Sequence, residues 1–135
     1  MRVVLDVNIL VSALIKSGKP RQLLFKIAEK KIQLVLSRGI LEEFLEVTEH
    51  PKVKRYVDEN DVVAFLRVLG NIATVVKARS KFEVVEEDPD DDVVLRTAYD
   101  AKAEYLVSGD RHLLLLEEFR KIKIVTVNQM LDNIK

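Results

Sequence analysis

The alternation of short β-rich runs with segments of helical periodicity constrains the fold of this chain more than any other feature of its sequence. Five runs rich in β-branched and aliphatic residues cover residues 2–5, 32–36, 73–77, 105–108 and 123–127. Between and after them, apolar residues recur at helical spacing over residues 21–30, 39–48, 62–69, 91–103, 113–119 and 129–134. Such alternation predicts a parallel sheet with helices on both faces and right-handed crossovers. We therefore predict an α/β fold, a three-layer α/β/α sandwich around a central parallel sheet of about five strands.

The length and composition suit one globular domain over residues 1–135, because 48% of the residues are hydrophobic and 33% are charged. No apolar run reaches the roughly 18 residues that a membrane span needs, and the first residues do not resemble a signal peptide. The absence of cysteine excludes disulfides and thiolate metal sites. These features predict a cytoplasmic protein without a membrane partner.

The formal net charge is zero, from 22 basic and 22 acidic residues. Proteins that bind nucleic acid often carry a basic excess, so the balance disfavours tight nonspecific binding to nucleic acid. It remains compatible with an enzyme in which an acidic metal site offsets basic residues elsewhere.

Two aspartates stand near strand ends. Asp6 directly follows the first predicted strand, and Asp110 follows the fourth by two residues. Open parallel sheets bind ligands beyond the carboxyl ends of their strands, so both residues are expected at the functional edge. An aspartate after a strand can also simply begin a turn, and for either residue alone that is the simpler interpretation.

Glu43 is a candidate because of the helical face on which it falls. It lies beside Ile40 and Val47, at the border of the apolar face, whereas Glu46 points to the opposite side of the same helix. Glu43 can therefore reach the sheet edge. An ordinary boundary glutamate is nevertheless the simpler interpretation of its position alone.

Asp91 belongs to an acidic run that precedes a predicted helix. It is spaced by three, four and seven residues from Val94, Leu95 and Ala98, which places it on the buried face, whereas Asp92 is expected to point away. Acids near a helix N-terminus are favoured by the helix dipole, but a carboxylate on a buried face is costly without compensation. Asp91 is therefore the acid of this run that requires a functional explanation.

Four carboxylates that converge on one sheet edge repel one another unless their pKa values rise or a cation lies among them. Oxygen ligands suit Mg²⁺ or Mn²⁺, and a chain with two histidines and no cysteine offers little for zinc. A hard cation held by carboxylates can activate water and neutralise the charge that develops on a phosphate. The four acids thus indicate phosphodiester hydrolysis.

Three segments resemble successive blocks of the PIN-domain family. LDVNILVSAL resembles its opening, LSRGILEEF its second block, and EDPDDDVVLRTAYDAKAEYLVSGD its third and fourth blocks combined. The blocks keep the order and spacing of the family over nearly the whole chain. Position by position, the resemblance assigns the acidic site to Asp6, Glu43, Asp91 and Asp110, with Asn8, Ser37 and Ser108 as supporting polar residues. Many members have threonine in place of Ser108.

The resemblance implies an endoribonuclease that requires Mg²⁺ or Mn²⁺ and hydrolyses phosphodiester bonds of single-stranded RNA. Small prokaryotic members are often the toxin of a toxin–antitoxin pair and are commonly homodimers, so an antitoxin and a second copy are the expected partners. A catalytically inactive PIN-like interaction domain and a PIN nuclease of RNA maturation or decay are the alternatives. Intact acids at all four positions disfavour the first of these.

Several polar residues have both structural and functional interpretations. Asn8 and Ser37 can each cap a helix instead of supporting the site. Five cations near predicted strand-end loops are candidates for contact with RNA phosphates, namely Arg38, Lys16, Arg111, Lys19 and Arg21. Such residues are more often plain surface charge.

The helical segment 62–69 offers more apolar surface than one contact with a sheet needs. Its apolar side chains are Val62, Val63, Phe65, Leu66 and Leu69. We expect this segment to contribute to a homodimer.

Three other α/β families fit the sequence less well. No G-x-G-x-x-G motif follows the first strand, which disfavours a dinucleotide-binding domain. A phosphatase with a nucleophilic aspartate usually has a second aspartate two residues later, where this chain has Asn8. A signalling receiver domain needs paired acids before Asp6 and a lysine at the last strand end, and neither is present.

Overall fold

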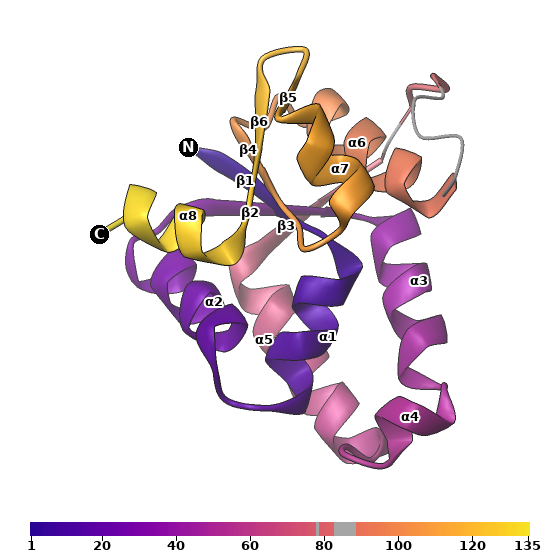
Figure 1. Ribbon diagram of the computed structural model, residues 1–135. Coiled ribbons are helices and arrows are strands. Elements are labelled where there is room, and N and C mark those ends of the chain that lie inside the picture. The colour runs from indigo at the N-terminus through magenta and orange to yellow at the C-terminus, as the bar shows by residue number, and fades with distance from the viewer. Residues whose placement is uncertain (78, 83–88) are drawn as a thin grey trace.

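The computed structural model describes residues 1–77, 79–82 and 89–135. Within them, six strands form one sheet in the order β3-β2-β1-β4-β6-β5 (Figure 1). The strands are β1 (Arg2–Leu5), β2 (Gln33–Ser37), β3 (Ala73–Val76), β4 (Tyr105–Val107), β5 (Glu118–Phe119) and β6 (Ile122–Val125). All neighbours pair in parallel except β5, which is antiparallel to β6. The predicted α/β class with five parallel strands is confirmed, and one short antiparallel strand is added to it.

Helices cover both faces of the sheet, as predicted for three layers (Figure 1). The helices are α1 (Val7–Ile15), α2 (Lys19–Glu29), α3 (Arg38–Thr48), α4 (Pro51–Lys54), α5 (Glu59–Ile72), α6 (Pro89–Asp100), α7 (Arg111–Leu116) and α8 (Val127–Asn133). One face carries α1, α2, α3, α5 and α8, with the short α4 between α3 and α5, and the other face carries α6 and α7. No helix in the described ranges is long and apolar enough to cross a membrane.

β1 is the central strand and the best-covered one. Val3, Val4 and Leu5 have no exposed surface, because helices pack on both sides of the strand. The parallel register pairs Leu5 with Val107 of β4. The residues that follow these two therefore leave the sheet side by side, at its carboxyl edge.

β5 occupies the place where the sequence predicted the end of a helix over residues 113–119. α7 stops earlier because Glu117 adopts a φ of 60°, a left-handed conformation that a right-handed helix cannot contain. Arg120 and Lys121 also have positive φ, 47° and 73°, and turn the chain back so that β5 pairs with β6. The spacing of apolar residues carries no information about backbone conformation. From the sequence alone, Phe119 fits the end of a longer helix as well as it fits a strand.

Asp100 ties residues 79–82 to the end of α6. Its Oδ2 accepts from the backbone N–H groups of Arg79 at 2.6 Å and Ser80 at 2.9 Å, and its Oδ1 accepts from the Ser80 hydroxyl. Burial raises the pKa of Asp100, but these bonds, with the charge of Arg79, outweigh it and lower the pKa from the ordinary value of 3.8. The carboxylate therefore stabilises the tie at neutral pH, and that stabilisation is lost as the pH falls through the folded pKa.

Candidate active site

Asp6 lies at the carboxyl end of the central strand and is buried, with 5% of its surface exposed. Its backbone N–H donates to the carbonyl of Val107 at 2.9 Å, which extends the pairing of β1 with β4 by one residue. The hydroxyl of Ser108 donates to Oδ2 of Asp6 at 2.7 Å, although the two residues are 102 positions apart. The parallel register thus places the Ser108 hydroxyl beside the carboxylate of Asp6, and the hydrogen bond between them orients that carboxylate.

Asp110 is joined to the same pair through its backbone. Its N–H donates to the hydroxyl oxygen of Ser108 at 2.9 Å, so Ser108 bridges Asp6 and Asp110. Oδ1 of Asp110 caps α7 by accepting from the backbone N–H groups of His112 at 2.7 Å and Leu113 at 3.4 Å. Asp6 and Asp110 therefore lie at the same edge of the sheet, as the strand pattern predicts, and Asp110 also caps a helix.

Ser37 and Thr97 connect α3 to α6. Ser37 caps α3, because its Oγ accepts from the backbone N–H of Ile40 at 3.3 Å. The hydroxyl oxygen of Thr97 lies 2.7 Å from Oγ of Ser37 and 2.8 Å from the carbonyl oxygen of Val93. Ser37 therefore does cap a helix, which is one of its two predicted roles. The sequence patterns did not predict a role for Thr97, although a hydroxyl on the apolar face of a helix was a usable indication.

The first turns of α6 carry two buried aspartates rather than one. Asp91 and Asp92 are each 4% exposed. The burial of Asp91 agrees with its predicted face, whereas the prediction that Asp92 points away is wrong. Tyr99, seven residues after Asp92 and on nearly the same side, is 40% exposed, so the N-terminal end of α6 is covered more completely than its C-terminal end. A projection down the helix axis cannot reveal such a change along the helix.

Glu43 and Glu46 differ in exposure on α3, as their spacing predicts. Glu43 is half-buried and Glu46 is exposed. The neighbouring Glu42 pairs at the surface with Arg38, with 2.9 Å between Oε1 and Nε. Glu43 is therefore the acid of this helix whose position best suits a role at the sheet edge.

The possible metal ligands at this edge are carboxylate oxygens, which suit Mg²⁺ or Mn²⁺ better than zinc. Asp6 and Asp91 are buried, and a buried charge is costly unless hydrogen bonds or a cation compensate for it. Within residues 1–77, 79–82 and 89–135, no three acidic or histidine side chains are close enough to hold one ion together. The oxygen donors fit a divalent cation by their chemistry rather than by their present spacing. The structure joins Asp6 to Asp110 through Ser108 but does not gather all four predicted acids around one point.

Asn8 lies exposed in the first turn of α1. The helix begins at Val7, and Asp6 occupies the N-cap position. The interpretation of Asn8 as the cap is therefore wrong, because the helix starts directly where the strand ends.

The five candidate cations divide into two groups. Arg38 and Arg111 begin α3 and α7, close to strand ends. Lys16 follows α1 and Lys19 begins α2, about 13 Å of helix away from the end of β1. Arg21 donates to two carbonyls at the end of α1, at 2.8 and 2.9 Å, and so caps that helix. The expectation that Lys16, Lys19 and Arg21 lie near strand-end loops is wrong, because α1 carries the chain away from the edge.

Comparison with known proteins identifies the fold and the family. A family model described as PIN domain matches residues 2–112, a range that contains all four predicted acids. An uncharacterized protein of Methanocaldococcus jannaschii is 32% identical over 123 residues, which cover 90% of this chain and 78% of that protein. A chain in the crystal structure of VapBC2 from Rickettsia felis, bound to a DNA fragment from their promoter, matches with a TM-score of 0.65 and 15% identity, over 93% of this chain and 98% of that one. That structural match shows a shared fold, and the family match shows that this chain belongs to the PIN-domain family of nucleases.

Proposed function

We propose that this protein is an endoribonuclease that hydrolyses phosphodiester bonds of single-stranded RNA and requires Mg²⁺ or Mn²⁺. The observation that carries the proposal is the buried carboxylate of Asp6 at the end of the central strand, bridged by Ser108 to Asp110. Carboxylates at this edge of a parallel sheet are suited to hold a hard cation where a ligand binds. Membership of a nuclease family supports the same chemistry.

The four acids have different proposed roles. Asp6 and Asp110 would hold the ion directly, while Glu43 and Asp91 would orient water beside it or hold a second ion. When bound, the ion supplies Lewis acidity, which makes water a better nucleophile and offsets the charge that develops on the phosphate. Ser108 keeps the carboxylate of Asp6 in one orientation, and the bonds from the first turn of α7 do the same for Asp110.

RNA cleavage by the purified full chain is expected to stop in EDTA and to return when Mn²⁺ or Mg²⁺ is added in excess. The ion should also raise the melting temperature, because a ligand that binds only the folded state stabilises it by about 2.7 kcal/mol at a hundred times its Kd. The measurements are gel analysis of a labelled single-stranded RNA and thermal melts. Cleavage that persists in chelator would contradict the metal requirement. RNA binding without cleavage under either ion would instead favour the inactive interaction domain.

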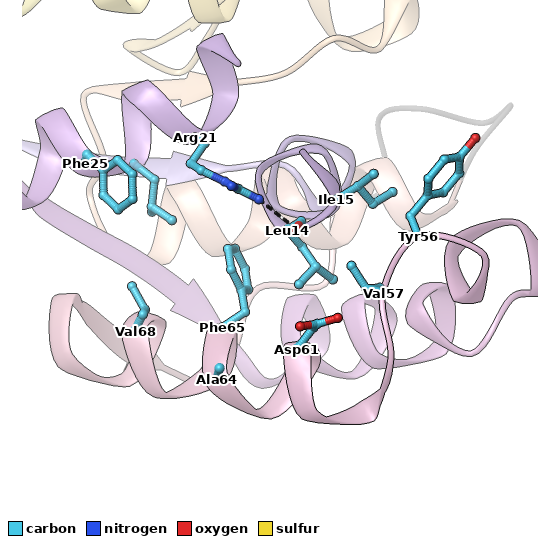
Figure 2. A pocket seen from close by; sticks show the side chains of 11 residues that line it. Leu14, Ile15, Arg21, Phe25, Tyr56, Val57, Asp61, Ala64, Phe65 and Val68 are labelled. Carbon is cyan, nitrogen blue, oxygen red and sulfur yellow. Dashed lines mark hydrogen bonds between the residues drawn. The ribbon is translucent and has the colours of Figure 1, made fainter. Parts of the chain in front are cut away.

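We also propose an antitoxin as a protein partner, in line with the small PIN nucleases that this chain resembles. An apolar groove of about 410 Å³ lies between α1, α2 and α5 and suits such a partner (Figure 2). Phe25 and Tyr56 line it and are 59% and 67% exposed. Exposed aromatic side chains of this kind are typical of protein interfaces. The test is co-expression with the product of the neighbouring gene, which should co-purify with the protein and inhibit RNA cleavage. Loss of both effects in Tyr56→Lys would locate the contact in this groove.

We also propose a homodimer, but fewer apolar side chains of segment 62–69 are available for the contact than the sequence suggested. Leu69 is buried, and the ring of Phe65 stacks on that of Phe44 with 5.7 Å between the centroids. Val62, Val63 and Leu66 line a second groove of about 530 Å³, on the other side of α5, together with Leu45. Val63 belongs to this groove and Val68 does not. We propose that Val63 lies in the dimer contact.

Light scattering at high micromolar concentration is expected to give a dimer for the wild-type chain and a monomer for Val63→Glu. Val68→Glu is the matched control, because Val68 lies on the same helix and is similarly exposed, 41% against 42% for Val63. Circular dichroism spectra of both variants that match the wild-type spectrum would show that neither substitution damages the fold. A monomeric wild type, or dissociation by Val68→Glu alone, would contradict the proposed contact.

A further inference from the structure

A third groove lies at the carboxyl edge of the sheet, beside the proposed active site. It is formed at the ends of β2 and β3 and at the N-terminal halves of α3 and α6, and its volume is about 330 Å³. Side chains that line it are Arg38, Glu42, Lys77, Ser80, Val93 and Arg96. We call it the basic groove. Because the strand order is β3-β2-β1-β4, the basic groove lies next to the strand end that carries Asp6, and Asp110 follows one strand further along the same edge.

Among the described residues that line it, the basic groove carries a net positive charge. Arg38, Lys77 and Arg96 contribute three positive charges against the one negative charge of Glu42, an excess of two. Glu42 pairs with Arg38, and Nε of Arg96 donates to the carbonyl of Phe82 at 2.7 Å, which fixes that side chain in the groove. The chain as a whole has 22 basic and 22 acidic residues, so this local excess does not follow from composition. A concave surface with such an excess attracts anions.

The walls of the basic groove are held by specific contacts. A Cβ atom at position 39 would lie 2.9 Å from Cγ1 of Val93, so glycine allows α3 to approach α6 closely. Ser37 and Thr97 join the same two helices. Ser80 forms another part of the wall and is tied to α6 by Asp100. Contacts within the folded chain therefore hold the walls of the basic groove in place.

We propose that the basic groove binds backbone phosphates of the RNA strand next to the bond that is cleaved, an inference that rests on the proposed function. Neighbouring strands lie about 4.8 Å apart, so the ends of β2 and β3 are roughly 5–10 Å from the strand end that carries Asp6. An arginine fork matches phosphate geometry, and a lysine adds a point charge. The N-terminus of α3, a helix of 11 residues, adds its positive dipole end. Phosphate contacts of this kind hold a strand in place without reading its sequence.

The experiment measures RNA binding separately from cleavage. The full chain with Asp6→Asn is titrated into a fluorescently labelled single-stranded oligoribonucleotide at several salt concentrations, and anisotropy gives the Kd. Adding Lys77→Gln is expected to weaken binding severalfold, and to reduce the slope of log K against log salt by about 0.7 for each phosphate that the protein no longer neutralises. Adding Arg38→Gln as well should enlarge both effects. Lys30→Gln, an exposed lysine that precedes β2 at the opposite edge of the sheet, is the matched control and should leave both values unchanged. Circular dichroism melts check that each variant is folded.

The outcomes separate the basic groove from the proposed function. Slopes and Kd values that stay at the level of the Lys30→Gln control in both groove variants would overturn the proposal, whether or not the wild-type chain cleaves RNA. Binding that depends on Lys77 in a chain whose wild type never cleaves RNA would support the groove and refute the nuclease. A polyglutamate peptide is the competing probe. If Lys77→Gln weakened binding of the peptide and left RNA binding unchanged, the groove would belong to an acidic protein segment and the proposal would fail.

Discussion

Asp6→Asn is expected to abolish RNA cleavage, a fall of roughly a thousandfold or more, while the protein stays folded. Loss of a charged metal ligand removes several kcal/mol of transition-state stabilisation, and each 1.36 kcal/mol is about tenfold in rate. The substitution keeps the size of the side chain, and an amide oxygen can still accept from Ser108. The backbone bond from residue 6 to Val107 does not involve the side chain at all. The substitution therefore removes the charge that would bind the ion and turns one carboxylate oxygen into an NH2 group.

Thermal melts with and without Mn²⁺ separate this loss of charge from a loss of structure. The metal-free melting temperature should stay the same or rise, because repulsion between buried carboxylates is relieved, but the increase on adding metal should disappear. Glu46→Gln is the matched control, since Glu46 is exposed on the same helix as the half-buried Glu43. Wild-type cleavage by Asp6→Asn, or an equal metal-induced shift in both proteins, would show that the ion is not held at Asp6.

Ser108→Ala should reduce cleavage by tenfold to a hundredfold, the usual effect of removing a group that orients a metal ligand. The hydroxyl of Ser108 donates to the carboxylate of Asp6 and accepts from the backbone N–H of Asp110, so its loss removes one contact from each of the two proposed ligand residues. The same change leaves the part-buried N–H of Asp110 without its partner, at a cost of at most about 1–3 kcal/mol in stability. Reduced cleavage should therefore accompany a lower melting temperature.

Two further variants distinguish orientation of Asp6 from simple destabilisation. Ser108→Thr retains the hydroxyl and should restore cleavage to near the wild-type level, even if the extra methyl group lowers stability in a site that is 1% exposed. Ser17→Ala removes an exposed hydroxyl between α1 and α2 and should change neither property. If Ser108→Ala needed no more Mn²⁺ than wild type for half-maximal cleavage and cut RNA equally fast, Ser108 would have no positioning role.

The sheet was predictable from the sequence because a buried parallel strand appears there as a short, continuous run of apolar residues. β1 is an apolar run that ends at a charged residue, and helical spacing resumes after each strand. β5 was not predictable in this way, because its position depends on the left-handed conformation of Glu117 rather than on the hydrophobicity of the segment. Patterns of side-chain type therefore give the layers of this fold more reliably than they give its turns.

The candidate site likewise has features that the sequence predicts and features that it does not. The placement of Asp6 and Asp110 at one edge follows from the common direction of the parallel strands, which the alternation of elements indicates. The bridge through Ser108 and the contact of Thr97 with Ser37 join residues 102 and 60 positions apart, and no spacing rule for one chain reaches that far. Asp92 was misplaced for a related reason, because its burial comes from the surroundings of the helix end and not from the helix itself.

The bond between Ser108 and Asp6 also has a consequence for the time at which the protein becomes active. A ribosome completes Asp6 early and Ser108 only 102 residues later. β1 can pair with β2 during synthesis, but its other neighbour, β4, spans Tyr105–Val107 and does not yet exist. For the proposed nuclease, the nascent chain would thus carry unassembled ligands during most of translation. The order of synthesis would protect the messenger RNA being read from the enzyme that it encodes.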